Sequence, residues 1–281
     1  MRLLITGGKG MLGRTLQRRL ASHTLSIADL PETDITDPAG LAAAMRAFRP
    51  DTVIHCAAMT RVDDCETHRE LAYRLNETGS RNVAAAARDV GARVIAISTD
   101  YVFDGHAARP YRETDEPAPA TVYGASKLAG EQAIAELLPG AHTILRIAWL
   151  FGPGGPSFVH ALMKLGADAD GAPLKVVDDQ IGNPTSTDAV ASVLEWLLDH
   201  PLNGIVHGSC EGETTWYGLA RELFARTGLR RPLQPCTTAE FPRPAPRPAN
   251  SRLEKGRLHE AGFQMPDWRD ALDRFLQSEQ V

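Results

Sequence analysis

Tyr123 and Lys127 lie four residues apart near the start of residues 121–137, a segment whose pattern predicts a helix. Residues at i and i+4 share one helix face, with Cβ atoms about 5–6 Å apart, so the ammonium would lie beside the phenol. A free tyrosine titrates near pH ~10, and a neighbouring cation favours its ionised form. The pair could therefore pass a proton near neutral pH, as a general acid must. The alternative for this pair alone is an exposed tyrosine and lysine on an amphipathic helix.

Three glycines, Gly7, Gly10 and Gly13, follow the apolar run 1–5 and open a segment with leucines at helical spacing. A strand, a glycine-rich turn and a helix in this order are the context of a dinucleotide fingerprint. One glycine makes the tight turn, one lets the backbone approach a pyrophosphate, and one allows the helix to pack on the strand. The amides and dipole of the helix N-terminus would hold the negative charge. A glycine-rich turn without a ligand is the alternative.

A third candidate group follows the apolar run 93–98, where Ser98, Thr99 and Asp100 stand in sequence. If this run is the fourth strand of a doubly wound sheet, its carboxyl end lies beside the first and third strands, close to a bound nicotinamide. Thr99 could then donate a hydrogen bond to a substrate carbonyl and stabilise the oxyanion that forms there. An ordinary turn hydroxyl is the alternative.

Apolar, strand-like segments alternate with helix-like segments through the first half of the chain. The strand-like segments are residues 3–6, 25–28, 52–57, 93–98 and 142–148. Such alternation predicts a parallel sheet covered by helices on both faces, and right-handed crossovers make it doubly wound. The predicted fold class is therefore α/β, a doubly wound parallel sheet of the Rossmann type with a smaller C-terminal substrate-binding lobe.

The second half of the chain has a less regular pattern, interrupted by proline and glycine. We expect residues 1–149 to form the dinucleotide-binding domain, with later strand and helix contributions near residues 182–225. Residues 150–281 would then form mainly the substrate-binding lobe. Residues 232–248 contain six prolines, which favours a loop inside this lobe.

Composition excludes several classes of partner. The chain has 281 residues, of which 43% are hydrophobic and 23% charged, as in ordinary soluble proteins. A net charge of −5 argues against nucleic acid, and no run approaches the ~20 apolar residues of a membrane span. The direct start into strand and glycine loop leaves no room for a signal peptide. Four cysteines without CxxC spacing indicate reduced thiols in a cytoplasmic protein with no metal site.

Two further positions suggest a cofactor wall. Asp29 ends the second predicted strand, where an acidic side chain accepts the hydroxyls of the adenosine ribose. Capping of the next turn is the alternative. Asp29 would disfavour a 2′-phosphate and no arginine follows at once, so the sequence leans towards NAD over NADP. Ala57 and Ala58 offer small side chains where a ligand could press against backbone, although a buried turn would need them equally.

Several longer strings match a known family. The strings at residues 7–13 (GGKGMLG), 98–103 (STDYVF) and 123–127 (YGASK) together resemble the extended short-chain dehydrogenase/reductase superfamily. Within it, the chain is similar to the dTDP-4-dehydrorhamnose reductase family. Further matches are AAMTRVD at 57–63, RIAW at 146–149, DQIGNPT at 179–185, TW at 215–216 and RPANSRL at 247–253. The resemblance covers almost the whole chain, and STDYVF, DQxGxPT and RPxNSRL are its most specific strings.

The resemblance implies hydride transfer from NADPH or NADH to the C4 keto group of a nucleotide-linked 4-keto-6-deoxy sugar. The implied catalytic residues are Thr99, Tyr123 as proton donor, and Lys127, which would bind the nicotinamide ribose and acidify Tyr123. Asp100 and Trp149 would contact the sugar nucleotide together with Thr99. The implied cofactor-binding residues are Gly7, Gly10, Met11, Leu12, Gly13, Asp29, Asp34, Ile35, Ala57, Ala58, Met59, Thr60, Tyr123 and Lys127.

The chain departs from the family pattern in two places. Where the family's metal-assisted dimer uses an acidic residue after the last fingerprint glycine, Arg14 and Thr15 follow Gly13. We therefore expect no metal and leave monomer and homodimer open. The third strand also ends His55-Cys56 instead of Asn-Ala, and we interpret His55 as a satisfied core histidine because no metal spacing accompanies it.

Two other functions share these motifs. A sugar-nucleotide epimerase or dehydratase of the same superfamily would keep the fold, but Tyr101 follows Asp100 where a dehydratase carries an Asp-Glu pair. A non-catalytic module resembling the regulatory subunit of methionine adenosyltransferase is the second alternative. The complete set of Thr99, Tyr123 and Lys127 favours an active enzyme. The nucleotide (dTDP or GDP), the C4 stereochemistry and the preference between NADH and NADPH stay open.

Overall fold

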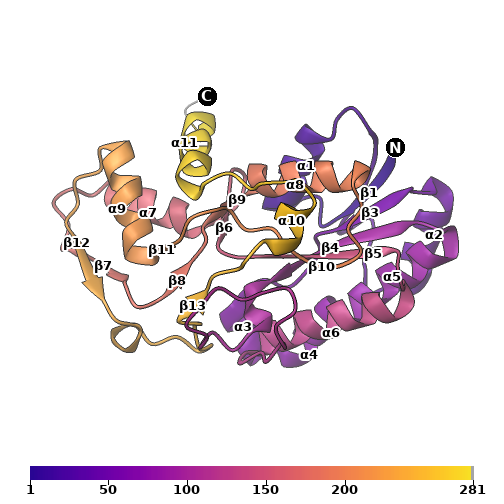
Figure 1. Ribbon diagram of the computed structural model, residues 1–281, viewed down its shortest axis with the longest axis horizontal. Helices are drawn as coiled ribbons and strands as arrows, with labels where there is room; N and C mark the ends of the chain where they lie inside the picture. Colours follow the sequence, from indigo (N-terminus) through magenta and orange to yellow (C-terminus); the bar gives the residue numbers. More distant parts are fainter. Residues whose placement is uncertain (280–281) are drawn as a thin grey trace.

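The computed structural model describes residues 1–279, and its central sheet confirms the predicted fold class. Six parallel strands form one sheet in the order β10-β5-β4-β3-β1-β2 (Figure 1). These strands are β1 (Arg2–Thr6), β2 (Thr24–Ala28), β3 (Thr52–His55), β4 (Arg93–Thr99), β5 (His142–Ile147) and β10 (Gly204–His207). Because β2 lies on one side of β1 and β3 on the other, the strand order reverses at β1. Ligands bind outside the carboxyl ends of the strands at such a switch point.

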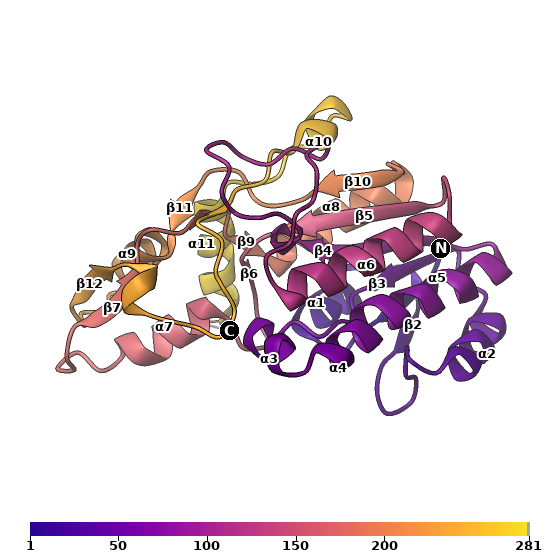
Figure 2. The same ribbon diagram turned by 90° about the horizontal axis from the view of Figure 1, so that it is seen from below.

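Helices cover both faces of this sheet. One face, at the front of Figure 2, carries α2 (Pro38–Phe48), α5 (Gly79–Val90) and α6 (Val122–Leu137). The opposite face carries α1 (Met11–Arg19) and α8 (Thr187–Asp199). Alternate residues of a strand point to opposite faces, so Leu3 and Ile5 join the apolar cluster with α1 and α8, whereas Leu4 joins the cluster with α2 and α5. Burial of both faces explains why the strands have continuous apolar sequences.

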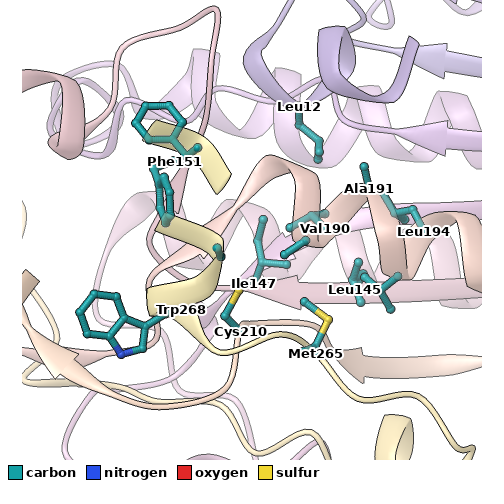
Figure 3. Packing of buried hydrophobic residues seen from close by; sticks show 14 of the residues in the cluster. Leu12, Leu145, Ile147, Phe151, Val190, Ala191, Leu194, Cys210, Met265 and Trp268 are labelled. Carbon is teal, nitrogen blue, oxygen red and sulfur yellow. The ribbon is translucent and has the colours of Figure 1, made fainter. Parts of the chain in front are cut away.

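The largest apolar cluster joins the sheet to the end of the chain. Figure 3 shows Leu145 and Ile147 of β5 near Val190 and Leu194 of α8, with Trp268 at the start of α11 (Trp268–Glu279) in the same cluster. Trp268 is fully buried. Truncation of a buried aromatic side chain to alanine costs about 3–5 kcal/mol, so α11 contributes substantially to the packing of the C-terminal lobe.

The predicted helix that carries Tyr123 is confirmed as α6. It begins after Thr121, whose side chain accepts a hydrogen bond from Gly124 N at 3.0 Å and so satisfies one of the open amides of the first turn. On the same face of the sheet, α3 (Val62–Thr67) is followed by a nearly continuous helix made of α4 (Arg69–Tyr73), the π-helical turn η1 (Arg74–Thr78) and α5. Single π turns inside helices are frequent at functional sites.

The C-terminal lobe lies at the left of Figure 1 and is built from helices and short strands. The further elements are β6 (Leu150–Phe151), α7 (Phe158–Gly166), β7 (Leu174–Val177), β8 (Ile181–Gly182), β9 (Thr185–Ser186), β11 (Thr214–Thr215), α9 (Trp216–Thr227), β12 (Leu233–Cys236), β13 (Asn250–Ser251) and α10 (Gly256–Glu260). The prediction of a plain loop at residues 232–248 is wrong in part, because the segment includes β12 and the 3₁₀ turn η3 (Thr238–Glu240). Pro235 fits into β12 because this strand forms a two-stranded sheet with β7, and edge strands tolerate a missing N–H.

Candidate active site

The glycine loop after β1 is pressed against the end of β3. Gly7 has φ of +67°, and a Cβ there would stand 2.7 Å from Ala57 N. A Cβ on Gly13 would run into the Gly7 carbonyl, so this glycine lets α1 pack on the loop. No side chain caps α1 within residues 1–279, and its first amides are available to an anion. The side chain of Leu12 is buried in the core, which leaves its backbone to face a ligand. The loop fits a dinucleotide pyrophosphate.

Asp29, Asp34 and Ile35, the residues predicted to bind the adenosine part of the cofactor, follow β2. The Asp29 carboxylate lies against the glycine loop, where Oδ2 accepts from Lys9 N at 2.7 Å and Oδ1 accepts from Leu30 N at 2.8 Å. Asp34 Oδ1 accepts both from the amide and from the hydroxyl of Thr36. Ile35 is buried in the core, so little of its side chain is left to contact an adenine.

The loop Ala57–Thr60 after β3 is held by Asn76, a residue that sequence analysis missed. Asn76 Oδ1 accepts from Met59 N at 2.7 Å, and its Nδ2 donates to Met59 O at 3.1 Å and to Ser126 Oγ at 2.9 Å. The side chain is fully buried within the π turn η1. Ala57 to Met59 are half-buried and Thr60 is exposed. A fixed backbone here would give a bound cofactor a rigid wall.

His55 is a satisfied core histidine, as predicted. Its Nδ1 lies 2.7 Å from Thr6 Oγ1 and its Nε2 lies 3.0 Å from Ser80 Oγ. Ser80 already donates to the carbonyl oxygen of Asn76, so His55 must donate to Ser80 from Nε2 and accept from Thr6 at Nδ1. Burial, together with the charge of Lys127, lowers the pKa of His55 to about 3, which keeps the ring neutral.

Thr99, Tyr123 and Lys127 gather at the carboxyl end of β4. Thr99 is the last residue of β4, and Tyr123 lies in the first turn of α6. The Thr99 hydroxyl lies close enough to the Tyr123 phenol to lower its pKa, and Lys127 Nζ donates to the carbonyl oxygen of Ile97 at 2.8 Å. All three residues are at most 9% exposed. The structure thus brings the three predicted catalytic residues together at the carboxyl end of β4, next to the loop held by Asn76.

Burial governs the acidity of this group. It raises the pKa of the Tyr123 phenol well above its usual value, although the Thr99 hydroxyl opposes the shift. Burial also lowers the pKa of Lys127 to about 8, against the opposing charge of Glu131. The expectation that Lys127 acidifies Tyr123 is therefore not met in this structure, because desolvation of the phenolate is the largest effect on Tyr123. Tyr123 keeps its proton at neutral pH, as a proton donor requires.

Asp100 and Ser251 bring a carboxyl and a hydroxyl group to the same side of the site. Burial raises the pKa of Asp100 to about 6, while Ser251 and Thr99 lower it. Asp100 Oδ1 accepts from the Thr99 hydroxyl at 3.0 Å. Asp100 Oδ2 and Ser251 Oγ are buried and lack a well-aligned hydrogen-bond partner among residues 1–279. Ser251 was missed by sequence analysis, although it stands in the RPANSRL string.

Trp149 follows β5 and reaches the C-terminal lobe. Its ring stacks on Trp216 with the centroids 3.5 Å apart. A Cβ on Gly182 would lie 2.5 Å from the Trp149 ring, so the Gly182 backbone packs closely against this indole. One face of the indole is therefore occupied by Trp216, and the ring is held between this side chain and the Gly182 backbone.

A buried ion pair lies one helical turn beyond Lys127. Glu131 binds Arg146 through two bonds, Nη2 to Oε2 at 2.6 Å and Nε to Oε1 at 3.0 Å, and also accepts from the Ser98 hydroxyl. The two side chains are 5% and 3% exposed. Removal of one partner of such a pair strands the other charge and costs about 3–5 kcal/mol. Sequence analysis missed Glu131, because only its pairing across to β5 shows the role.

Asp63 and Arg247 connect the two sides of the site. Arg247 Nη2 lies 2.8 Å from Asp63 Oδ2, and Ala245 N donates to Asp63 Oδ1 at 3.2 Å. Asp63 belongs to α3, which follows the cofactor wall, and Arg247 belongs to the proline-rich segment.

Among residues 1–279, no cluster of three or more His, Cys, Asp or Glu side chains is arranged to hold a metal ion, and no helix has the length and apolarity to cross a bilayer.

Comparison with known proteins gives full-length matches. A family model described as the RmlD substrate binding domain matches residues 1–281. The chain is 43% identical over 280 residues to the dTDP-4-dehydrorhamnose reductase of Streptomyces griseus, covering 96% of this chain and 91% of that protein. It is also 43% identical over 281 residues to a probable dTDP-4,6-dihydroxy-2-methyloxan-3-one 4-ketoreductase of Streptomyces antibioticus, covering 97% and 93% of the two chains. A crystal structure of dTDP-4-dehydrorhamnose reductase from Bacillus anthracis in complex with NADP aligns with a TM-score of 0.95 at 38% identity over 99% of both chains.

Proposed function

This chain belongs to the dTDP-4-dehydrorhamnose reductase family, and we propose that it reduces the C4 keto group of a dTDP-4-keto-6-deoxy sugar with NADPH or NADH. The substrate is dTDP-4-dehydro-L-rhamnose and the product dTDP-L-rhamnose, in keeping with the relatives' names. One observation carries the assignment: Thr99 at the end of β4 and Tyr123 in the first turn of α6 lie together at the carboxyl end of the sheet, whose first strand ends in a glycine loop of the kind that binds dinucleotides.

The cofactor site would be formed by the carboxyl ends of β1, β2 and β3. The open amides of α1 would bind the pyrophosphate, Asp29 the adenosine ribose, and the loop held by Asn76 the stretch towards the nicotinamide. Lys127 would bind the nicotinamide ribose. NAD(P)H, when bound, supplies a hydride.

Tyr123 would protonate the C4 oxygen as the carbon receives the hydride, so that the ketone becomes a secondary alcohol. Thr99, whose hydroxyl donates to Asp100 Oδ1 in this structure, would turn from that carboxylate to donate a hydrogen bond to the same oxygen and stabilise its developing charge. Asp100 Oδ2 and Ser251 Oγ, which lack well-aligned partners among the described residues, would hold a neighbouring sugar hydroxyl. Tyr123 would regain its proton from solvent after product release.

The test is turnover by the purified protein of dTDP-4-dehydro-L-rhamnose, measured as loss of the reduced nicotinamide absorbance and identified by the sugar product. Tyr123→Phe should lose about 10²–10⁴-fold in kcat. Tyr101→Phe is a matched control, because its ring lies 5.5 Å from that of Tyr123. Activity of Tyr123→Phe within a few-fold of the wild type would refute the assigned role.

Two alternatives have distinct outcomes in the same assay. Faster turnover of dTDP-4,6-dihydroxy-2-methyloxan-3-one than of dTDP-4-dehydro-L-rhamnose would favour the second relative's kind of 4-ketoreductase. Tightly bound NAD, with no net consumption of the reduced cofactor, would favour an epimerase. Binding of a methionine adenosyltransferase without any keto-sugar turnover would favour the regulatory module. We place the reaction in the cytoplasm, since the four cysteines are free thiols, as is usual in a reducing compartment.

A further inference from the structure

Lys9 lies between the glycine loop and the residue that would bind the adenosine ribose. Its backbone amide donates to Asp29 Oδ2 at 2.7 Å. Its ammonium pairs with Glu32 Oε2 at 2.7 Å and also donates to the carbonyl oxygen of Leu30. The glycine loop and the end of β2 run side by side, because Gly7 N donates to Ala28 O at 3.1 Å. The Lys9 side chain therefore reaches the place where a 2′-hydroxyl or a 2′-phosphate would sit.

The charges at this place do not by themselves choose between the two cofactors. Asp29 and Glu32 each bring a negative charge and Lys9 a positive one. A 2′-phosphate beside Asp29 needs a cation close to it, since like charges at short range repel. The Lys9–Glu32 pair is well exposed, with 52% and 67% of the two side chains accessible. Exposed pairs of this kind are worth about 0–1 kcal/mol, so Lys9 can leave Glu32 at little cost.

We infer that Lys9 and Glu32 set the phosphate preference of the cofactor site. In complexes with NADPH, Lys9 leaves Glu32 and pairs with the 2′-phosphate, so the chain accepts this cofactor in spite of Asp29. In complexes with NADH, Asp29 binds the ribose hydroxyls and Lys9 stays with Glu32. The flexible stem and compact charge of lysine suit such an exchange of partners. This inference rests on the proposed function only in placing the dinucleotide on the glycine loop.

Binding of adenine nucleotide fragments tests the inference without any sugar substrate. The Kd of 2′,5′-ADP and of 5′-ADP is measured by calorimetry for the wild type, Lys9→Gln and Glu32→Gln. Lys9→Gln should weaken 2′,5′-ADP roughly threefold to tenfold, and Glu32→Gln should tighten it by a similar factor. The Kd of 5′-ADP should stay within about twofold in both variants, since the same principle assigns the change to the 2′-phosphate alone. The ratio of kcat/KM for NADPH and NADH should move in the same directions.

A second exposed pair provides the control. Lys175 and Glu240 lie 3.4 Å apart with 51% and 48% of their side chains accessible, and they stand in the C-terminal lobe. Lys175→Gln and Glu240→Gln change the net charge by the same amounts and should leave both Kd values unchanged. An unaltered 2′,5′-ADP affinity in Lys9→Gln, or an equal shift for both fragments, would overturn the inference. Loss of sugar turnover with the predicted Kd changes would refute only the proposed function.

Discussion

The indole of Trp149 lies parallel to the indole of Trp216, with an interplanar angle of 9°. The backbone of Trp149 has φ of +50°, in the left-handed region that costs a non-glycine residue of order 1–3 kcal/mol. The contact with Trp216 and the close approach of Gly182 hold the side chain in this conformation. The stack therefore fixes the Trp149 ring at the junction between the sheet and the C-terminal lobe, where the sugar nucleotide would bind.

A methyl group at position 182 should disturb this stack. Gly182→Ala places a Cβ within 2.5 Å of the Trp149 ring, so the indole must move. We expect the KM of the sugar nucleotide to rise roughly tenfold, since misplacement by about an ångström is costly in a binding site. The Kd of NADPH should stay unchanged. Gly256→Ala is the control, because a Cβ there meets no atom closer than 3.7 Å among the described residues. An unchanged KM would show that Trp149 does not position the substrate.

The pH dependence of kcat/KM should reflect the ionisation of the Lys127 amine. Burial lowers the pKa of this amine to about 8, so the ammonium is lost as the pH rises through this value. The groups that face Lys127 are Glu131 from its own helix, His55 at the end of β3 with Cys56 directly after it, and the Ile97 carbonyl from β4. We expect kcat/KM to fall above about pH 8. Lys127→Arg keeps the charge at all accessible pH values, and should remove this fall while lowering the maximum.

Glu131 should influence the pH at which kcat/KM falls. Its negative charge raises the pKa of Lys127 against burial, so Glu131→Gln should move the alkaline limb to lower pH. The variant also strands the buried Arg146 and is expected to lose about 3–5 kcal/mol of stability. If this variant unfolds, Ser98→Ala can be measured instead, because it removes one hydrogen bond to Glu131 and keeps the Glu131 charge. In Ser98→Ala, kcat/KM should therefore still fall near pH 8. A shift of this fall would contradict the claim that the charge of Glu131 sets the pKa of Lys127.

Asp100 should lower the stability of the folded protein at neutral pH and yet be needed for full activity. Burial raises the pKa of its carboxyl to about 6, above the value of 3.8 of an unperturbed aspartate. The folded state then binds more protons than the unfolded state between these values, so stability falls as pH rises through this window. Asp100→Asn should stabilise the protein at pH 7 by roughly 1–3 kcal/mol and reduce activity. Its advantage in thermal unfolding should vanish below about pH 4. A variant less stable than wild type at pH 7 would contradict this account.

Local sequence patterns predict most of the fold. The six-stranded sheet follows from buried apolar runs such as Leu3 to Ile5, and α6 from its Thr121 cap and helical spacing. The glycine loop was predictable because its close backbone contacts leave no room for a side chain at Gly7 or Gly13. This requirement is visible in the sequence as the spacing of the glycines. The two-stranded sheet of β7 and β12 was missed, since its pairing joins segments distant in the chain.

The site was less predictable, because its support comes from long-range contacts. Asn76 reaches Met59 and Ser126 from a π turn that no local pattern reveals. Ser251 meets Asp100 only through the folding of the C-terminal lobe onto β4. The acidity of Tyr123 was misjudged because spacing shows a neighbouring charge but does not show the burial that outweighs it.

The ion pair of Asp63 and Arg247 should couple the C-terminal lobe to the cofactor wall. Burial raises the pKa of Asp63, but Arg247 and the Ala245 amide outweigh this effect and bring it below its usual value. The carboxylate therefore stabilises the contact above about pH 4, and this contribution is lost as acid protonates it. Asp63→Asn and Arg247→Gln should each raise the KM of the sugar nucleotide.

A double-mutant cycle separates coupling from two independent losses. The single variants and the double variant are compared by KM of the sugar nucleotide and by thermal unfolding. Residues in direct contact show interaction energies of about 0.5–3 kcal/mol, so the double variant should be little worse than either single one. The Arg19–Glu195 pair, 2.8 Å apart between α1 and α8, is the control, and its neutralisation should leave the KM unchanged. Strictly additive effects of Asp63→Asn and Arg247→Gln on KM would show that the pair does not act as a single link across the site.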